Sequence, residues 1–133
     1  AEQDIIIMTA AVADFCPSHP ADEKIKKNDS SYEAVIELER TEDSVSYLGA
    51  HKAKGQLICG FSMETQNMLE NSKAKLAKKN ADMIVANNLK VAGAGFGTDT
   101  NVVTLITADD CTELEIMDKS CVAARIMDRL LQM

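Results

Sequence analysis

Apolar and polar positions follow two different periods along the chain, and segments of the two kinds come in a regular order. Three short, nearly continuous apolar runs, "DIIIM" at 4–8, "QLICGFS" at 56–62 and "ADMIVAN" at 81–87, predict strands buried on both faces. Between them, "TEDSVSYLGAHKAKG" at 41–55 and "ETQNMLENSKAKLAKKN" at 64–80 have the spacing of amphipathic helices. Parallel neighbours need a crossover connection, so this order predicts a largely parallel sheet with flanking helices.

The first of these helices has a predicted start and a predicted inner face. Thr41 is a candidate N-cap, and the acidic residues after it suit the first turn of a helix. Val45, Leu48 and His51 follow at helical spacing along one face. Between this helix and the first strand, residues 32–40 alternate in polarity, which predicts a half-exposed strand.

The pattern changes after Asn88. "GAGFGTDTN" at 93–101 is a loop, and "NVVTLIT" at 101–107 and "ELEIM" at 113–117 predict a hairpin. The last segment, 118–133, is the clearest helix. It carries two apolar series at i, i+4 spacing: Val122, Ile126 and Leu130, and Ala123, Met127 and Leu131.

Composition narrows the class of protein. The 133 residues suit one domain, with 46% hydrophobic residues and no apolar run of the ~20 residues that span a bilayer. We expect a cytoplasmic protein whose four cysteines are reduced, and their wide spacing makes a zinc site improbable. The net charge of −7 argues against nucleic-acid binding.

Against this acidic background, seven of the 14 basic residues fall within 24–27 and 73–79. "ADEKIKKNDS" at 21–30 has no apolar periodicity, so Lys24, Lys26 and Lys27 belong either to a solvated loop or to an anion site. Lys75 and Lys79 are neighbours at i, i+4 on a helix. They mark either a solvated helix face or a clamp for a polyphosphate.

Ligands of parallel sheets bind beyond the carboxyl ends of the strands. Here those ends are "TAAVADF" at 9–15, "GFSMET" at 60–65 and "ANNLKVAGAGFG" at 86–97. Asp14 could accept a hydrogen bond from an amino group or hold a metal, or it could be an ordinary turn residue beside tightly packed alanines. The helix start "TEDSV" at 41–45 offers backbone N–H groups to an anion, provided that a divalent cation offsets its acidic residues.

Several known motifs are absent. "GAGFG" has the spacing G-x-G-x-G and leads toward a strand, so it does not match the dinucleotide fingerprint, and its glycines are better explained by positive φ. There is no Walker P-loop and no G-x-S-x-G elbow. His19 and His51 lack patterned partners for a metal site or a catalytic triad.

Five segments together carry a family resemblance. "AAVADF", "EKIKK", "GFSMET", "KLAKKNADMIVANN" and "GFGTDTN", in that order and spacing, resemble phosphopantothenate–cysteine ligase, in bacteria commonly the CTP-dependent C-terminal half of the bifunctional coenzyme A biosynthesis flavoprotein. The resemblance implies a Rossmann-like α/β fold, with a C-terminal β-hairpin plus helix. It also implies a homodimer that forms partly through strands beyond the main sheet, and fusion to a flavin-dependent decarboxylase domain. No membrane or nucleic-acid partner is implied.

The implied reaction has two steps. The carboxylate of 4′-phosphopantothenate attacks the α-phosphorus of CTP, giving an acyl-cytidylate and pyrophosphate with Mg²⁺ bridging the phosphates. The amine of cysteine then attacks the acyl carbon and releases CMP. By position, Lys24 resembles the family's catalytic lysine, and Asp14 the residue that helps to organise the metal. The implied nucleotide-binding residues are Ala10, Asp14, Lys24, Asp43, Ser44, Val45, Phe61, Lys75 and Lys79.

The chain departs from the family pattern at Glu42, commonly proline, and at Asn88, often aspartate. The family's glycine-rich N-terminal stretch and its N-x-S-S-G segment, which bind phosphopantothenate, have no counterpart before Ala1. The chain therefore resembles a partial domain that lacks the N-terminal strands, with a mobile flap at about 16–31. We expect it to bind CTP weakly or not at all alone and not to complete the ligation. Two alternatives are a non-catalytic folding or dimerisation module and a nicotinamide-dependent oxidoreductase.

Overall fold

The computed structural model describes residues 2–25, 35–64, 68–88, 91, 93–95 and 97–133. The chain divides into two compact units: unit 1 comprises residues 1–10 and 44–133, and unit 2 comprises residues 11–43. None of the helices in the described ranges combines the length and the apolarity that a bilayer crossing requires.

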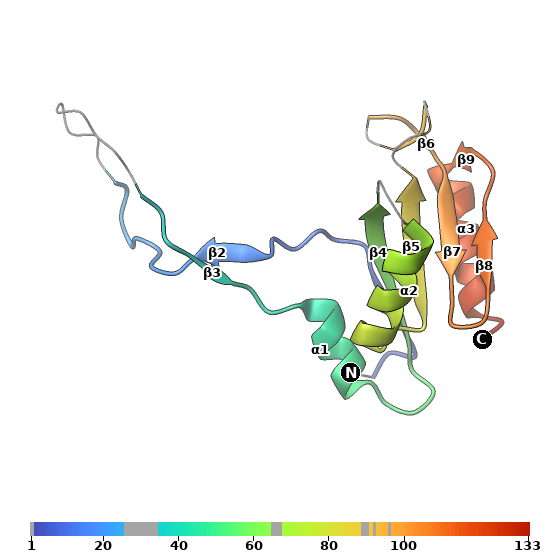
Figure 1. Ribbon diagram of the computed structural model, residues 1–133, viewed down its shortest axis with the longest axis horizontal. Coiled ribbons are helices and arrows are strands. Elements are labelled where there is room, and N and C mark those ends of the chain that lie inside the picture. Colours follow the sequence, from blue (N-terminus) through green and yellow to red (C-terminus); the bar gives the residue numbers. More distant parts are fainter. Residues whose placement is uncertain (1, 26–34, 65–67, 89–90, 92, 96) are drawn as a thin grey trace. The chain divides into compact units, whose positions relative to one another are not determined.

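Unit 1 is built on a five-stranded sheet with the strand order β1-β4-β5-β7-β8 (Figure 1). β1 (Ile5–Met8), β4 (Leu57–Glu64) and β5 (Met83–Asn88) are parallel, as the three apolar runs predict. β7 (Val103–Ile106) and β8 (Cys111–Glu113) continue the sheet as an antiparallel hairpin, whose second strand begins two residues earlier than expected. β6 (Thr100–Asn101) and β9 (Met117–Asp118) form a separate antiparallel pair.

Helices cover both faces of this sheet. α1 (Ser44–His51) and α2 (Met68–Lys79) lie on one face and α3 (Lys119–Leu130) on the other, which gives three layers (Figure 1). Successive strand residues point to opposite faces, so each strand contributes to two cores. On the α1 and α2 face the core comprises Ile58, Leu76, Ala81 and Ile84, with Val45 and Leu48 packed against it. On the α3 face it comprises Cys59, Met83, Val85, Val103, Leu105, Val122, Ile126 and Leu130.

Only one of the two apolar series on α3 is buried. Val122, Ile126 and Leu130 pack against the sheet, whereas Met127 and Leu131 are exposed. The first residue of the helix is a lysine, a charge that the positive end of the helix dipole disfavours. Lys119 is tolerated there because its Nζ donates to the Thr98 carbonyl at 2.6 Å, which ties the helix start to the segment before β6.

α1 and α2 approach each other very closely at one point. A Cβ atom at Gly49 would lie 1.8 Å from the Lys79 carbonyl oxygen, so only glycine allows this contact. The Asn80 side chain then donates to the Gly49 carbonyl at 2.8 Å. Asn80 itself has φ of 49°, which is uncommon for a residue other than glycine and suits the residue that follows a helix.

Unit 2 contains a two-stranded ribbon and no buried residue among those that the structure describes. β2 (Phe15–Pro17) pairs antiparallel with β3 (Leu38–Arg40). The predicted strand at 32–40 is therefore wrong in its length, since residues 35–37 are not strand and 32–34 lie outside the described residues. Its half-buried character is also wrong, because every described residue of it is exposed.

The predicted start of the first helix needs correction as well. α1 begins at Ser44, and its first turn contains no acidic residue. Thr41 is not its cap, because the Thr41 hydroxyl donates to the Ala13 carbonyl and its backbone N–H donates to the Asp14 carbonyl at 3.0 Å. Thr41, which the sequence pattern assigned to the helix start, instead forms hydrogen bonds within unit 2.

Candidate functional site

The carboxyl ends of the three parallel strands form a stepped edge, which we call the carboxyl edge. Met8, the last residue of β1, is paired with Gly60, whereas β4 continues to Glu64 beside Asn88 of β5. The last four residues of β4 thus extend beyond β1, and the exposed Ala10 follows the end of the shorter strand. This step is where a ligand of a parallel sheet is expected to bind.

The start of α1 packs beside this step. Val45 Cγ1 lies 3.6 Å from the position that a Cβ would occupy at Gly60, so the first turn of the helix packs over this residue of β4. Val45 is half-buried against the core of that face, which commits its side chain to packing. Its predicted contact with a nucleotide would therefore have to come from its backbone, as would that of its neighbour Ser44 at the first position of the helix.

α2 is fastened to β4 near the carboxyl edge. The Ser62 and Ser72 hydroxyls lie 3.2 Å apart, and both residues are buried. Lys75 lies three positions after Ser72, and Lys79 lies three positions after the buried Leu76. Both lysines are half-buried on this side of the helix. They are therefore not on the fully solvated face. They lie about 10 Å and 16 Å along the helix from its start, so Lys75 is the nearer of the two to the carboxyl edge.

Phe61 faces the opposite side of the sheet from these lysines. Its side chain is partly buried and packs against the core under α3, whereas α2 covers the other face. The ring thus reaches a ligand only from the α3 side of the carboxyl edge. Its predicted contact with a base or ribose stays a prediction.

Three of the predicted site residues lie in unit 2. Asp14 is exposed, and its carbonyl accepts the Thr41 N–H within the ribbon. Lys24 is also exposed. Cys16 and Pro17, the first residues of the predicted flap, belong to β2, so a flap could begin only after them. Lys26 and Lys27 lie outside the described residues. Asp43 is the last residue of the unit and is exposed.

A chain of amides at the carboxyl edge was not predicted from the sequence. Asn101 Nδ2 donates to Asn87 Oδ1 at 2.8 Å, and Asn87 Nδ2 donates to the Ser62 carbonyl at 3.5 Å. Polar residues at the ends of otherwise apolar strands were the available signal, since Ser62 and Asn87 both interrupt such runs. The sequence alone gave no reason to connect Asn87 with a residue 14 positions away.

Magnesium fits the described residues only in part. Within the described ranges, no three Cys, His, Asp or Glu side chains come together to hold a metal ion. Asp14 would supply a single carboxylate, so a Mg²⁺ ion there would need oxygen ligands from a bound molecule such as a nucleotide phosphate. The ion would neutralise phosphate charge when bound.

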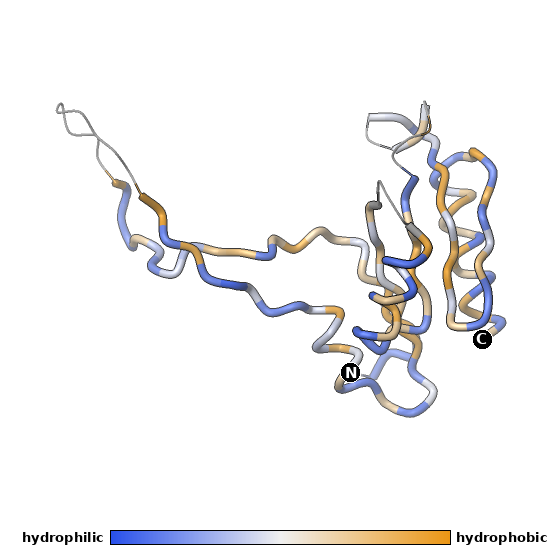
Figure 2. Tube along the Cα trace, viewed as in Figure 1, coloured by the Kyte–Doolittle hydropathy of each residue, from blue (hydrophilic) through white to orange (hydrophobic). Residues whose placement is uncertain are grey.

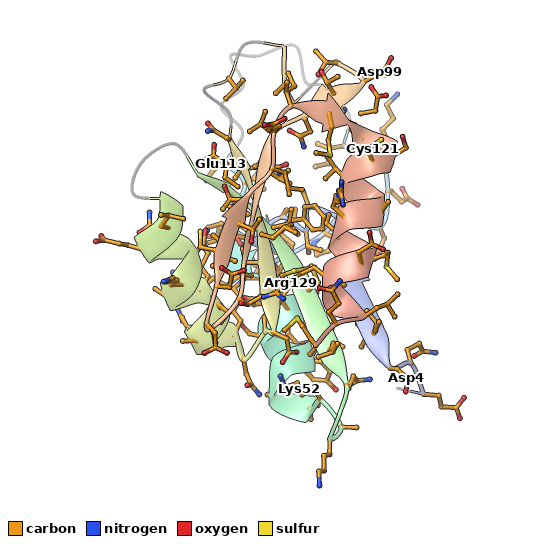
Figure 3. The ribbon with its side chains drawn as sticks, turned by 90° about the vertical axis from the view of Figure 1, so that its right-hand side faces the viewer. Asp4, Lys52, Asp99, Glu113, Cys121 and Arg129 are labelled. Carbon is orange, nitrogen blue, oxygen red and sulfur yellow. The ribbon has the colours of Figure 1, made fainter. Side chains whose placement is uncertain are left out.

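An ion pair and a surface depression lie away from this edge. Lys52 Nζ bonds to Asp82 Oδ1 at 2.8 Å, and Asp82 Oδ2 accepts the Ile58 N–H at 2.8 Å. Figure 3 shows Lys52 at the end of unit 1 opposite Asp99. A depression of about 430 Å³ between β8 and α3 contains none of the predicted site residues.

The fold and the polar carboxyl edge define the class as a Rossmann-like α/β domain. The chain belongs to the DNA/pantothenate metabolism flavoprotein C-terminal domain family, whose sequence model matches residues 1–133.

Among curated relatives, it is 47% identical over 128 residues to the coenzyme A biosynthesis bifunctional protein CoaBC of Bacillus subtilis (strain 168), covering 96% of this chain and 31% of that protein. It is also 47% identical over 131 residues to a cysteine/cysteine sulfinic acid decarboxylase of an unknown prokaryotic organism, covering 98% of this chain and 36% of that protein. The chain thus spans about a third of the length of these relatives.

Solved structures agree with this assignment. The crystal structure of the C-terminal domain of a CoaBC protein matches with a TM-score of 0.73 and 42% identity, over 97% of this chain and 56% of that chain. The DNA/pantothenate metabolism flavoprotein from Streptococcus pneumoniae matches with a TM-score of 0.76 over 98% of this chain and 64% of that chain. At 16% identity, the second match shows the fold alone.

Proposed function

We propose that this chain is the nucleotide-handling part of a phosphopantothenate–cysteine ligase that acts in coenzyme A biosynthesis in the cytoplasm. The observation that carries the proposal is the match to the CoaBC C-terminal domain over nearly the whole chain. The stepped carboxyl edge supports it, since Ala10, Phe61 and the start of α1 all lie there. CTP is the proposed nucleotide.

In the proposed reaction, the carboxylate of 4′-phosphopantothenate attacks the α-phosphorus of CTP, and the bond to the pyrophosphate leaving group breaks. The cysteine amine then attacks the acyl carbon, forming the amide and releasing CMP. Negative charge builds on the phosphoryl oxygens during the first step, and an ammonium group there stabilises the transition state more than the ground state. Lys24 is assigned this role, and Lys75 and Lys79 bind phosphate charge.

Substitution of Lys24 tests the proposal. In the full natural protein that contains this chain, Lys24→Gln is expected to lower the rate of acyl-cytidylate formation by about 10²–10³-fold, as removal of a charge stabiliser does. Lys54→Gln is the matched control, because Lys54 is also exposed but lies between α1 and β4, at the end of the sheet opposite the carboxyl edge. Mass spectrometry of the products, with CTP, 4′-phosphopantothenate and cysteine supplied, gives the measurement.

Three results would each contradict a different part of the proposed function. Wild-type turnover with ATP but not CTP would overturn the choice of nucleotide. An absence of ligation would favour the non-catalytic module. Equal activity of the two variants would remove Lys24 from the mechanism.

Unit 2 supports a homodimer. Its described residues leave six large apolar side chains exposed: Val12, Phe15, Ile25, Val35, Ile36 and Leu38. In Figure 2 the tube of this unit carries hydrophobic stretches, although none of its described residues is buried. A two-stranded ribbon is marginally stable alone, and a second copy would cover these side chains.

The names of the relatives support one further part of the proposal. The CoaBC relatives are called bifunctional, and this chain matches about a third of the one from B. subtilis. The natural protein that contains this chain is therefore proposed to carry a flavin-dependent decarboxylase domain as well.

A further inference from the structure

Three hydrogen bonds at the carboxyl edge form a chain with a fixed direction. The Val102 N–H donates to Asn101 Oδ1 at 3.0 Å, Asn101 Nδ2 donates to Asn87 Oδ1 at 2.8 Å, and Asn87 Nδ2 donates to the Ser62 carbonyl at 3.5 Å. The first and last groups are backbone groups, of which one can only donate and the other can only accept. Each amide between them therefore has only one orientation that satisfies both of its neighbours.

Asn101 determines this direction. Its oxygen must face the Val102 N–H, so its NH₂ group faces Asn87. Asn87 must then turn its oxygen toward Asn101, which directs its own NH₂ group toward Ser62 on β4. Without Asn101, only the Ser62 carbonyl, through the longest of the three bonds at 3.5 Å, would hold this orientation of the Asn87 carboxamide.

The chain of amides lies where the proposed ligand contacts begin. Asn87 is the register partner of Met63, two residues beyond Phe61 on the same face of β4. The Asn88 N–H also donates to the Val102 carbonyl at 3.1 Å, so both ends of the loop that leaves β5 are held together. Asn87 and Asn101 are half-buried, which limits competition from water for these bonds.

We propose that Asn101 is a positioning residue of the ligase site. It acts through Asn87, whose NH₂ group it presents at the carboxyl edge beside the β4 residues that contact the nucleotide. The inference depends on the proposed function, because it assigns Asn101 an effect on nucleotide binding. Asn101 is not a catalytic residue, since its described bonds go to Asn87 and to the backbone.

An isosteric reversal tests the inference in the full natural protein. Asn101→Asp keeps an oxygen for the Val102 N–H but turns an acceptor toward Asn87, which must flip and oppose the Ser62 carbonyl with its oxygen. Asn101→Ala removes the bond that helps to orient the Asn87 carboxamide but does not force that carboxamide to flip. We expect the KM for CTP to rise at least tenfold in Asn101→Asp and less in Asn101→Ala, with the KM for cysteine unchanged in both. Gln132→Glu, which adds the same charge at the exposed end of the chain, is the control.

A purely structural role predicts that activity falls only as far as the melting temperature does, with the KM for CTP unchanged in both variants. Both variants should lower the melting temperature, because alanine removes two side-chain bonds and aspartate makes two oxygens oppose each other. A double-mutant cycle adds a second readout: in an Asn87→Ala background, Asn101→Ala should not change the KM for CTP further.

The outcomes separate this inference from the proposed function. Absence of ligation by the wild-type protein overturns the proposed function and this inference with it. Ligation by the wild-type protein, together with an unchanged KM for CTP in Asn101→Asp or additive effects in the cycle, overturns the inference alone.

Discussion

Unit 1 and unit 2 use apolar residues in opposite ways. Unit 1 contains every buried residue that the structure describes, on both faces of one sheet. Unit 2 has apolar side chains on both of its strands, and its described residues bury none of them. Unit 1 is therefore stabilised by its own packing, whereas the order of unit 2 depends on backbone pairing and on whatever covers its side chains.

The largest expected effect comes from opening the core of unit 1. Ile126→Ala removes a buried side chain under α3 and should lower the free energy of unfolding by about 2–5 kcal/mol. Leu38→Ala, in the exposed ribbon of unit 2, should change it by less than about 0.5 kcal/mol. Urea unfolding at low protein concentration measures both. A large loss in Leu38→Ala would show that unit 2 has a core of its own.

The contact between α1 and α2 gives the next effect. Gly49→Ala places a Cβ against the Lys79 carbonyl and should destabilise unit 1 by about 1–3 kcal/mol, because the two helices must separate. Ala50→Ser, one residue further along on the exposed face of α1, is the control. Thermal unfolding compares the two, and equal melting temperatures would show that the helices move apart at no cost.

Association should depend on unit 2 alone. Leu38→Glu puts a charge among the exposed apolar side chains of the ribbon and should weaken dimerisation at least tenfold, about 1.4 kcal/mol. Leu131→Glu is the control, since Leu131 is an exposed leucine of unit 1. Sedimentation equilibrium measures the dissociation constant. A monomeric wild-type protein at high concentration would contradict the proposed dimer.

Alkaline pH should weaken unit 1 through one thiol. Burial raises the pKa of the Cys59 thiol to about 12, whereas an unfolded thiol ionises near about 8.5. Below the pKa of the thiol in the unfolded state, the buried neutral thiol makes its full contribution to stability. As pH rises toward the folded pKa, only the unfolded state loses its proton, so stability falls by up to about 1.4 kcal/mol per pH unit.

Cys59→Ala should remove this slope between pH 8.5 and 10.5, measured by urea unfolding across that range. Cys111→Ala should keep it, because Cys111 is exposed. A slope that survives in Cys59→Ala would assign the pH dependence to other groups.

The smallest effect is expected in acid. A hydrogen bond from the Thr112 hydroxyl, then one from the Cys111 backbone and the nearby Arg129, hold the pKa of Asp110 below its usual value. Ionised Asp110 therefore stabilises the fold at a pH above the pKa that it has in the unfolded state. This stabilisation is lost as the pH falls through the pKa of Asp110 in the folded state. Asp110→Asn should therefore flatten the acid side of the stability profile slightly, from about pH 5 downward. An identical profile would show that the exposed carboxylate contributes nothing.

The sequence predicted unit 1 far better than unit 2 because burial leaves a pattern in sequence. The apolar runs of β1, β4 and β5 and the Val122 series on α3 are repeated constraints that one core imposes. Residues 32–40 alternate equally well in sequence, yet the described residues among them, 35–40, are all exposed, so burial does not distinguish their two sides. The missed cap had the same origin, since Thr41 bonds to Ala13 in a pairing that local spacing does not encode.

The candidate site was predictable in location but not in its connections. The strand ends and the family motifs indicated the carboxyl edge, and Ala10, Val45 and Phe61 do lie at the ends or faces that meet there. The commitment of the Val45 side chain to packing, and the bond between Asn87 and Asn101, depend on three-dimensional register. The register of the strands is determined by the pairing of the whole sheet, so it cannot be predicted from any single segment of the sequence.

β8 is one of the two outer strands of the sheet, and its charge limits how copies of this protein can pair along that strand. Among the described residues β8 pairs only with β7, and the segment around it carries Asp109, Asp110, Glu113 and Glu115, all exposed. Pairing of two β8 strands from different copies would bring like charges together. Repulsion between these carboxylates therefore disfavours edge-to-edge growth into an open-ended stack. The acidic residues around β8 and the exposed apolar side chains of unit 2 are therefore expected to favour the proposed closed pair over fibres.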